Sequence, residues 1–306
     1  MTRHESTIVL AAILLIAPVG PVMARAAATT ASSTRLFADS RLATFDRISI
    51  EIVGHGPDLV FIPGLASSRE TWRATAERLR DRYRLHLIQI AGFAGEPARG
   101  NADGPVVIPT AEAIDAYIVG QKLSPAVVIG HSLGGTIALW LAEHHPDHLK
   151  KILLVDTLPF FATVMMGPGA TPDQVRGVAE KIRTGPPQPA EARDRMLAAM
   201  VTGPTKRARL ADWAKASDPT VVANALADDL ELDLRPGLAA IPTPITLLYP
   251  DYLSVGMPAG AADGQYGAAY AAAPHKVLRR VDHSLHFIML DQPEAFAADL
   301  DAFLGS

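Results

Sequence analysis

The sequence predicts an α/β fold in which a mostly parallel central sheet is flanked by helices and interrupted by inserted helices. Strand-like and helix-like segments alternate from residue 48 onward, as expected of parallel strands joined by helices. The alternation stops between residues 158 and 222, where only helical patterns and glycine–proline pairs occur. We therefore expect an α/β core at 41–157 and 223–306, with a helical cap at 158–222.

Local hydrophobic patterning predicts the elements of this core. Residues 48–53 and 58–62 are apolar strands on either side of a turn sequence at 54–57, which predicts a β-hairpin. Residues 68–83 predict an amphipathic helix, because apolar residues recur there at helical spacing. The other expected elements are strands at 84–90, 126–129, 151–155, 245–249 and 276–281, and helices at 110–123, 136–144 and 293–304.

The first residues resemble a secretory signal peptide. Residues 8–16 form an unbroken apolar run that follows a basic residue and is short for a membrane span. Small residues at Ala24 and Ala26 suit cleavage. We expect a signal peptide at 1–26, a flexible lead-in at 27–40, export to the periplasm or the medium, and no stable membrane span after cleavage. An uncleaved N-terminal anchor and a misassigned start are the alternatives.

The composition excludes several classes of function. The 306 residues are 49% hydrophobic and 20% charged, and they carry a formal net charge of −4 without a basic cluster, so nucleic acid is not an expected partner. The absence of cysteine excludes disulfides and cysteine-ligated metals. We expect surface or packing roles for His144, His145 and His148, because a proline interrupts their spacing at a helix end. No metal or organic cofactor is expected.

The motif at 130–134, GHSLG, carries the clearest chemical signal. An apolar run leads into it and a helix-forming run leaves it, which is the strand–turn–helix context that a GxSxG motif requires. A serine in such a turn is held in a strained conformation with its hydroxyl exposed above the sheet. A serine hydroxyl also needs a base that works near neutral pH. The motif therefore predicts that Ser132 is a nucleophile.

From about residue 48 to the C-terminus, these features resemble the α/β-hydrolase family, in which a nucleophile, an acid and a histidine follow one another along the chain. The resemblance implies an α/β-hydrolase fold and a catalytic histidine. His286 matches it best, because the residues after it run into the last helix as they do in the family. His283 is the alternative if the loop is shifted.

The same resemblance leaves the acid open among three aspartates. The family usually places its acid shortly after the strand predicted at 245–249, where Asp251 is the nearest carboxylate and the first choice, although a proline replaces the usual glycine. Asp156 ends the preceding strand and is the second choice, and Asp263 is the third. In each case the carboxylate would orient His286 and stabilise its charged form.

The resemblance also implies an oxyanion hole and a substrate pocket. The backbone N–H groups of Leu65 and Leu133 are the expected oxyanion donors, although the loop containing Leu65 lacks the family's histidine. The candidate substrate-binding residues are Phe93, Phe160, Phe161 and Tyr252. Core packing of the inserted helices is the alternative role for the pair at 160–161.

Together these features predict a serine hydrolase that cleaves a carboxylic ester through an acyl-enzyme, with a small-molecule acyl substrate as its partner. An aminopeptidase, amidase or lactonase using the same residues is the near alternative. A binding protein of this fold with little or no catalysis is the alternative of another class. The sequence does not indicate an oligomeric state.

Overall fold

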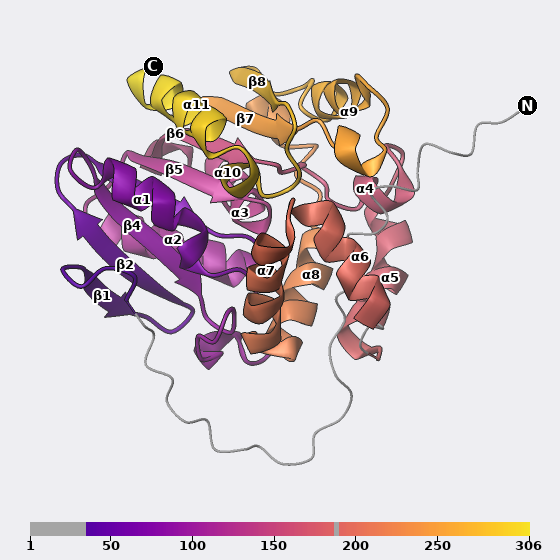
Figure 1. Cartoon of the computed structure of the whole chain (residues 1–306), viewed down its shortest axis with the longest axis horizontal. Helices are drawn as coiled ribbons and strands as arrows, with labels where there is room; N and C mark the ends of the chain where they lie inside the picture. The colour runs from indigo at the N-terminus through magenta and orange to yellow at the C-terminus, as the bar shows by residue number, and fades with distance from the viewer. Residues whose placement is uncertain (1–34, 187–189) are drawn as a thin grey trace, which may run out of the picture.

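An eight-stranded sheet lies at the centre of the computed structural model, which describes residues 35–186 and 190–306 (Figure 1). The strand order is β1-β2-β4-β3-β5-β6-β7-β8. Strands β3 to β8 are mutually parallel, whereas β1 and β2 are antiparallel to their neighbours. The bounds are β1 Arg41–Thr44, β2 Ile48–Gly54, β3 Asp58–Ile62, β4 Arg84–Ile90, β5 Ala126–His131, β6 Leu149–Val155, β7 Ile245–Pro250 and β8 Lys276–Val281. The predicted mostly parallel α/β fold is confirmed.

The predicted hairpin between β2 and β3 is wrong. Strand β4 lies between them, antiparallel to β2 and parallel to β3. The turn between β2 and β3 packs directly against residues 80–83, which lead into β4. A Cβ atom added at Gly54 or Gly56 would lie within 2.4 Å of backbone carbonyl oxygens in this segment. Both glycines have positive φ angles, +85° and +109°, which let the backbone make this close approach. The turn therefore connects two strands that do not pair with each other, and it does not form a β-hairpin.

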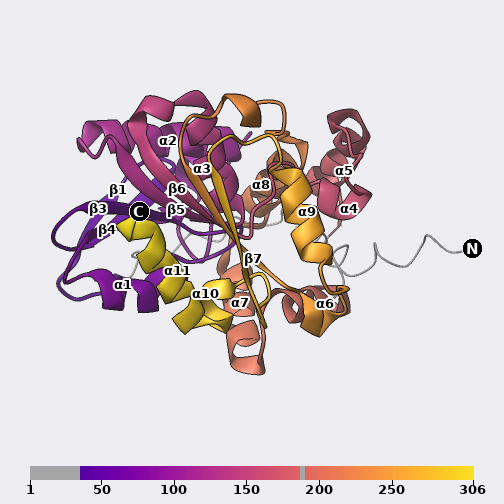
Figure 2. The ribbon, with the colours of Figure 1, turned by 90° about the horizontal axis from the view of Figure 1, so that it is seen from above.

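Helices cover both faces of the sheet (Figure 2). Helices α2 (Val107–Gly120) and α3 (Leu133–His144) lie on one face, and α1 (Arg73–Leu79), α10 (Ile288–Asp291) and α11 (Pro293–Gly305) lie on the other. Each helix buries an apolar side against the strands, as Trp72, Ala76 and Leu79 do around α1. This burial is the main stabilising contribution to the fold.

Residues 35–40 belong to this core, so the prediction that the flexible lead-in extends to residue 40 is wrong. The Phe37 ring is buried among the residues of the α1 face, and the backbone N–H groups of Leu36 and Phe37 donate to the carboxylate of Glu51. Arg80 also lies over the Phe37 ring, 5.0 Å from its centroid. The predicted signal peptide and the rest of the lead-in, residues 1–34, lie outside the described residues.

In the described residues between β6 and β7, five α-helices lie at one side of the core (Figure 1). They are α4 Thr163–Met166, α5 Pro172–Thr184, α6 Ala190–Met200, α7 Pro204–Ala216 and α8 Pro219–Glu231. We call them the cap. Helix α8 continues beyond the predicted end of the insertion at 222 and packs against α5. A further helix, α9 (Ala261–Ala269), follows β7. Within residues 35–186 and 190–306, no helix is long and apolar enough to cross a membrane.

Candidate active site

Ser132 lies in the turn between β5 and α3, in a conformation that few residues adopt. Its φ and ψ angles are +53° and −122°. The glycines of the motif are required by close packing, because a Cβ atom at Gly130 would lie 2.2 Å from the carbonyl oxygen of Gly134, and one at Gly134 would lie 2.4 Å from that of Ile62. The predicted strained serine turn is therefore present, and the surrounding backbone contacts hold it in place.

Asp156 lies against His286, and these two residues form the charged centre of the site. The Asp156 Oδ2 atom is 2.5 Å from His286 Nδ1, and both side chains are buried. Asp156 follows the end of β6 directly and has a positive φ angle of +49°, which turns its carboxylate out of the sheet. The contact assigns the proton to Nδ1 and leaves the other ring nitrogen of His286 free to accept one.

Two tyrosines complete the surroundings of Asp156. The hydroxyl of Tyr252, in the turn after β7, donates to Oδ2, and the hydroxyl of Tyr266, from α9, donates to Oδ1. Burial, followed by the charge of Asp156, raises the pKa of both phenols well above the usual value, so both remain protonated donors. Asp156 therefore accepts three hydrogen bonds inside the protein.

The structure contradicts Asp251 as the acid partner of His286. Its Oδ2 accepts from the backbone N–H of His283 at 2.8 Å, and its Oδ1 accepts from that of Leu253 at 3.2 Å. Asp251 thus links two loops by accepting from their backbone N–H groups, and both of its carboxylate oxygens already have hydrogen-bond partners. Asp263 is also excluded, because it accepts from Tyr249 and pairs with Arg280. The alternative acid, Asp156, has the geometry expected of the acid.

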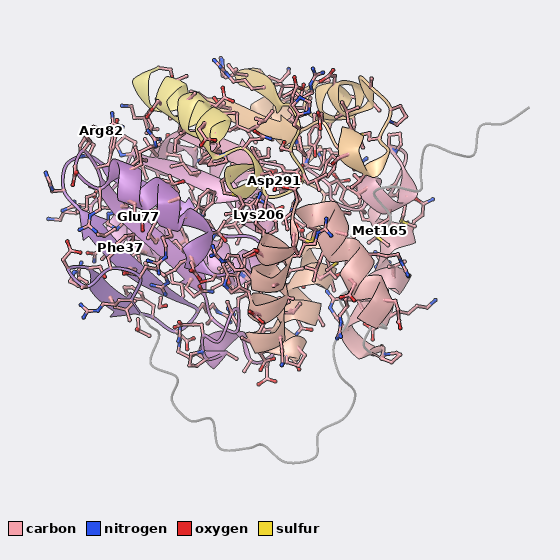
Figure 3. All side chains as sticks on the ribbon, viewed as in Figure 1. Phe37, Glu77, Arg82, Met165, Lys206 and Asp291 are labelled. Carbon is pink, nitrogen blue, oxygen red and sulfur yellow. The ribbon has the colours of Figure 1, made fainter. Side chains whose placement is uncertain are left out.

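The loop that carries His286 is fixed from two sides. The Nε2 atom of His131, the residue before the serine, lies 3.0 Å from the carbonyl oxygen of His286. Burial lowers the pKa of His131 well below the usual value, so its neutral imidazole donates this hydrogen bond. The carboxylate of Asp291 accepts from the backbone N–H of Leu285 and pairs with Lys206 of α7 at 2.9 Å (Figure 3). The loop is therefore anchored to both the core and the cap. His283, the rejected alternative, is exposed.

A cavity between the core and the cap brings these residues together. Ser132, Asp156 and His286 line it, so the carboxyl ends of β5 and β6 open toward the cap. No hydrogen bond joins Ser132 to His286 in the described part of the chain. The remaining walls are mostly apolar, as is usual for a site that takes a small organic molecule. They include Leu65, Leu158, Phe161, Val164, Met196, Met200, Leu226, Tyr252 and Phe287.

Two of the four predicted substrate-binding residues line this cavity, and two do not. Phe161 and Tyr252 line it. Phe93 is fully buried in the main core cluster, and Phe160 packs within the cap, with the Arg235 guanidinium over its ring. The predictions for Phe93 and Phe160 are therefore wrong, because both rings stabilise the fold.

The two predicted oxyanion donors lie beside the serine. A Cβ atom at Gly64 would lie 3.1 Å from the Ser132 Cβ, so the loop that contains Leu65 passes directly against the nucleophile. Leu133 begins α3, where the N–H groups of a helix have no partner within the helix. Within residues 35–186 and 190–306, neither N–H has a protein acceptor. Both are therefore available to a bound oxygen.

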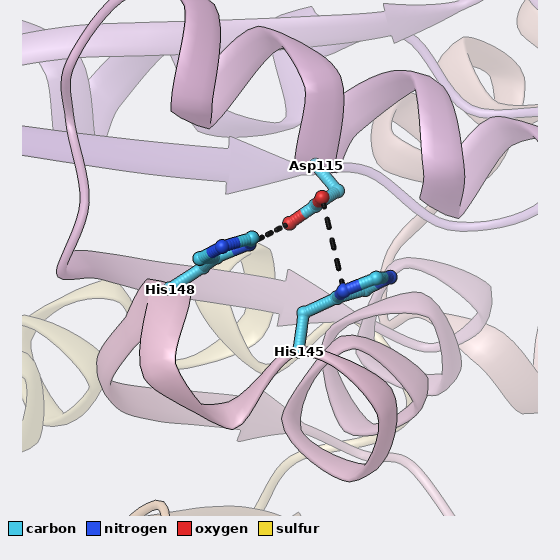
Figure 4. A group of neighbouring side chains, drawn as sticks. All are labelled: Asp115, His145 and His148. Atoms are coloured by element: carbon cyan, nitrogen blue, oxygen red, sulfur yellow. Dashed lines mark hydrogen bonds and ion pairs between the residues drawn. The ribbon is translucent and has the colours of Figure 1, made fainter.

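A separate group of side chains lies at the end of α3, on the surface of the core (Figure 4). Asp115 of α2 accepts from His148 at 2.7 Å and lies 3.9 Å from His145, and the two imidazole rings are stacked. Two ligands of one zinc ion, each about 2.0 to 2.2 Å from the metal, would lie more than 3 Å apart in a tetrahedral site. The Asp115–His148 contact is thus a hydrogen bond. His144 stacks on Trp140.

Comparison with known proteins gives the class of this fold and site. The model of the alpha/beta hydrolase family matches residues 59–299, so the chain belongs to that family. Among the solved structures that share the fold, an esterase from Thermogutta terrifontis has a TM-score of 0.68 at 20% identity, and the match covers 86% of this chain and 98% of the esterase chain. An enol-lactonase from Burkholderia xenovorans has a TM-score of 0.67 at 20% identity, and the match covers 87% of this chain and 100% of the enol-lactonase chain.

Sequence relatives are named as esterases. A pimeloyl-[acyl-carrier protein] methyl ester esterase of Vibrio cholerae is 28% identical over 265 residues, which are 83% of this chain and 96% of the relative. The protein of the same name from Aeromonas salmonicida is 33% identical over 138 residues, 45% of this chain and 49% of the relative.

Proposed function

We propose that this protein is a serine esterase that cleaves a carboxylic ester through an acyl-enzyme intermediate. The observation that carries the proposal is the convergence of a strained serine and an Asp156–His286 pair on one largely apolar cavity. This is the set of groups that acyl transfer requires, a nucleophile, a base and a group that orients the base. The names of the sequence relatives support an ester substrate over an amide.

In the first half of the reaction, Ser132 Oγ attacks the ester carbonyl carbon while the free ring nitrogen of His286 takes the hydroxyl proton. Asp156 holds the ring in the required tautomer through the 2.5 Å contact and stabilises the imidazolium. His286 then returns the proton to the departing alkoxide, and the acyl group stays on the serine. The alcohol is the first product.

In the second half, His286 takes a proton from water as the water oxygen attacks the acyl carbon. The proton returns to Ser132 Oγ as the acyl–oxygen bond breaks, and the carboxylic acid leaves. The negative oxygen of each tetrahedral intermediate would accept from the N–H groups of Leu65 and Leu133, and one such donor contributes about 10²- to 10³-fold in kcat.

The experiment is hydrolysis of p-nitrophenyl esters of short and medium chain length, together with labelling by a fluorophosphonate probe. The parent protein should turn over and label, whereas Ser132→Ala should do neither, because removing such a serine costs on the order of 10⁶-fold in kcat. Thermal unfolding of both proteins checks that each is folded. A folded parent that neither labels nor hydrolyses any ester would overturn the proposal and favour a binding role.

Export is a second proposal, and the sequence of residues 1–26 supports it. Its test is the N-terminal sequence of the protein recovered from the periplasm or medium of a bacterial culture. A start after residue 24 or 26 is expected. Recovery of uncleaved protein from the cytoplasm alone would contradict it.

A further inference from the structure

Asp229 is a carboxyl group in the cavity that the proposed reaction does not use. It lies on α8, in the cap, and lines the same cavity as Ser132 and His286. The residue is only 7% exposed. A buried carboxylate is costly unless donors surround it, so its partners determine what it can do.

The protein leaves Asp229 incompletely paired. Its Oδ1 atom is buried and has no hydrogen-bond partner, and no lysine or arginine of residues 35–186 and 190–306 forms an ion pair with it. The preceding residue shows the contrast, because Asp228 accepts from Arg183 and from the backbone N–H groups of Val106 and Val107. One of two consecutive aspartates thus has its hydrogen-bond partners within the fold, whereas the other lines the cavity and has one oxygen with no partner among the described residues.

The neighbours of Asp229 place it near the reaction centre. The Thr136 side chain lies beside it, and Thr136 also lines the cavity. Thr136 lies four residues after Ser132 at the start of α3, about 6 Å along the helix axis. The other walls nearby, such as Leu226 and Phe161, are apolar. A ligand that reaches both Ser132 and Asp229 would therefore combine an apolar body with one polar group.

We propose that Asp229 binds a hydrogen-bond donor of the substrate, an ammonium or a hydroxyl group, so that the preferred substrates are esters whose acyl chain carries such a donor on an apolar body. This inference rests on the proposed esterase function and adds the substrate class. In its ionised form Asp229 accepts up to four hydrogen bonds and donates none, so a donor is the group that completes this form. Among the described residues no hydrogen bond joins His286 to Asp229, and the Nδ1 atom of His286 is paired with Asp156.

The ionisation of Asp229 agrees with this role. Its pKa is raised to about 7: burial has the largest effect and raises it, the Thr136 side chain lowers it, the charge of Asp228 raises it, and His286 lowers it. The carboxyl group is therefore balanced between its neutral and charged forms near neutral pH. An ammonium group beside it would favour the charged form and would gain a charge-assisted hydrogen bond.

The experiment compares kcat/KM for p-nitrophenyl hexanoate, 6-hydroxyhexanoate and 6-aminohexanoate. The three chains are alike except for the terminal group, so the ratios isolate the donor. We expect the parent to prefer at least one donor-bearing ester by about 10-fold or more, because a hydrogen bond to a charged group contributes about 1.5–3 kcal/mol. Asp229→Leu should abolish the preference. Asp229→Asn should abolish it for the amino ester and keep part of it for the hydroxy ester.

Asp212→Asn is the matched control, because Asp212 is an exposed aspartate on another cap helix, α7. It should keep the parent's ratios. A parent that prefers the plain hexanoate, or an unchanged preference in both folded Asp229 variants, would overturn the inference. Fluorophosphonate labelling of Ser132 in the parent separates this failure from failure of the esterase proposal, since labelling does not depend on the acyl chain.

Discussion

Asp156 and Asp251 follow neighbouring parallel strands, β6 and β7, yet they have different roles. Both are buried at the carboxyl edge of the sheet. Asp156 accepts from three side chains, those of Tyr252, Tyr266 and His286, whereas Asp251 accepts from two backbone N–H groups. Position at the sheet edge therefore does not decide which carboxylate serves the histidine. The side chains that surround each carboxylate decide it.

The largest expected effect is on Asp156. Asp156→Asn should lower kcat for ester hydrolysis by about 10⁴-fold, because the neutral amide neither holds the histidine tautomer nor stabilises the imidazolium. Steady-state hydrolysis of the best p-nitrophenyl ester measures it. Loss of less than tenfold in a folded variant would mean that Asp156 is not the acid.

A third buried carboxyl, Asp229, sharpens the comparison because it lacks the donors that Asp156 and Asp251 have. Its pKa of about 7 in the folded state exceeds the usual aspartate value of 3.8, so the folded state holds the proton more tightly than the unfolded state. The contribution of Asp229 to the free energy of unfolding is therefore fully present below about pH 4, and it is lost as the pH rises to about 7.

Asp229→Asn removes this pH-dependent loss. Relative to the parent, the variant should gain free energy of unfolding between pH 5 and pH 8, by at most about 3 kcal/mol, because about two pKa units of the difference lie above pH 5. Urea unfolding of both proteins at the two pH values measures the change. A difference between the proteins that is the same at both pH values would contradict a raised pKa.

Tyr266→Phe tests whether the tyrosines position the acid. Removing one donor to a buried carboxylate should lower kcat about tenfold with little change in KM, since a hydrogen bond to a charged group contributes about 1.5–3 kcal/mol. Tyr270→Phe is the matched control, because Tyr270 donates to the Thr157 carbonyl oxygen and not to Asp156. Equal effects of both substitutions would point to packing alone.

The smallest effect on activity is expected at Asp251. Asp251→Asn should change kcat less than threefold, but it should lower the free energy of unfolding by about 0.5–1.5 kcal/mol, because one of the two backbone N–H groups loses its acceptor. Urea unfolding and ester hydrolysis on one preparation measure both quantities. A large loss of kcat with unchanged stability would restore Asp251 as the acid.

Local sequence predicted the parts of the molecule that local interactions determine. The serine turn and the strand at 276–281 were predictable because a motif or an apolar run encodes each. The order of residues in the family also predicted His286 as the histidine of the site. The hairpin prediction failed because the packing of the turn against residues 80–83 depends on contacts that only the folded chain makes.

The acid and its surroundings depend on contacts between distant segments. Tyr252 and Tyr266 lie 96 and 110 residues from Asp156 in the chain, and no local pattern links them. The sequence does contain one indication of the role of Asp229. This aspartate lies between Leu226 and Leu230 on the apolar side of a cap helix, where a charged residue is rare unless it has a partner.

The most direct test measures the rate of fluorophosphonate labelling for the parent, Asp156→Asn and Asp251→Asn, with Ser132→Ala as the blank. Labelling reports the nucleophile's activation without knowledge of the natural substrate. The account predicts slow labelling of the Asp156 variant, near-parent labelling of the Asp251 variant and none of the blank. Near-parent labelling of the Asp156 variant with slow labelling of the Asp251 variant would contradict it.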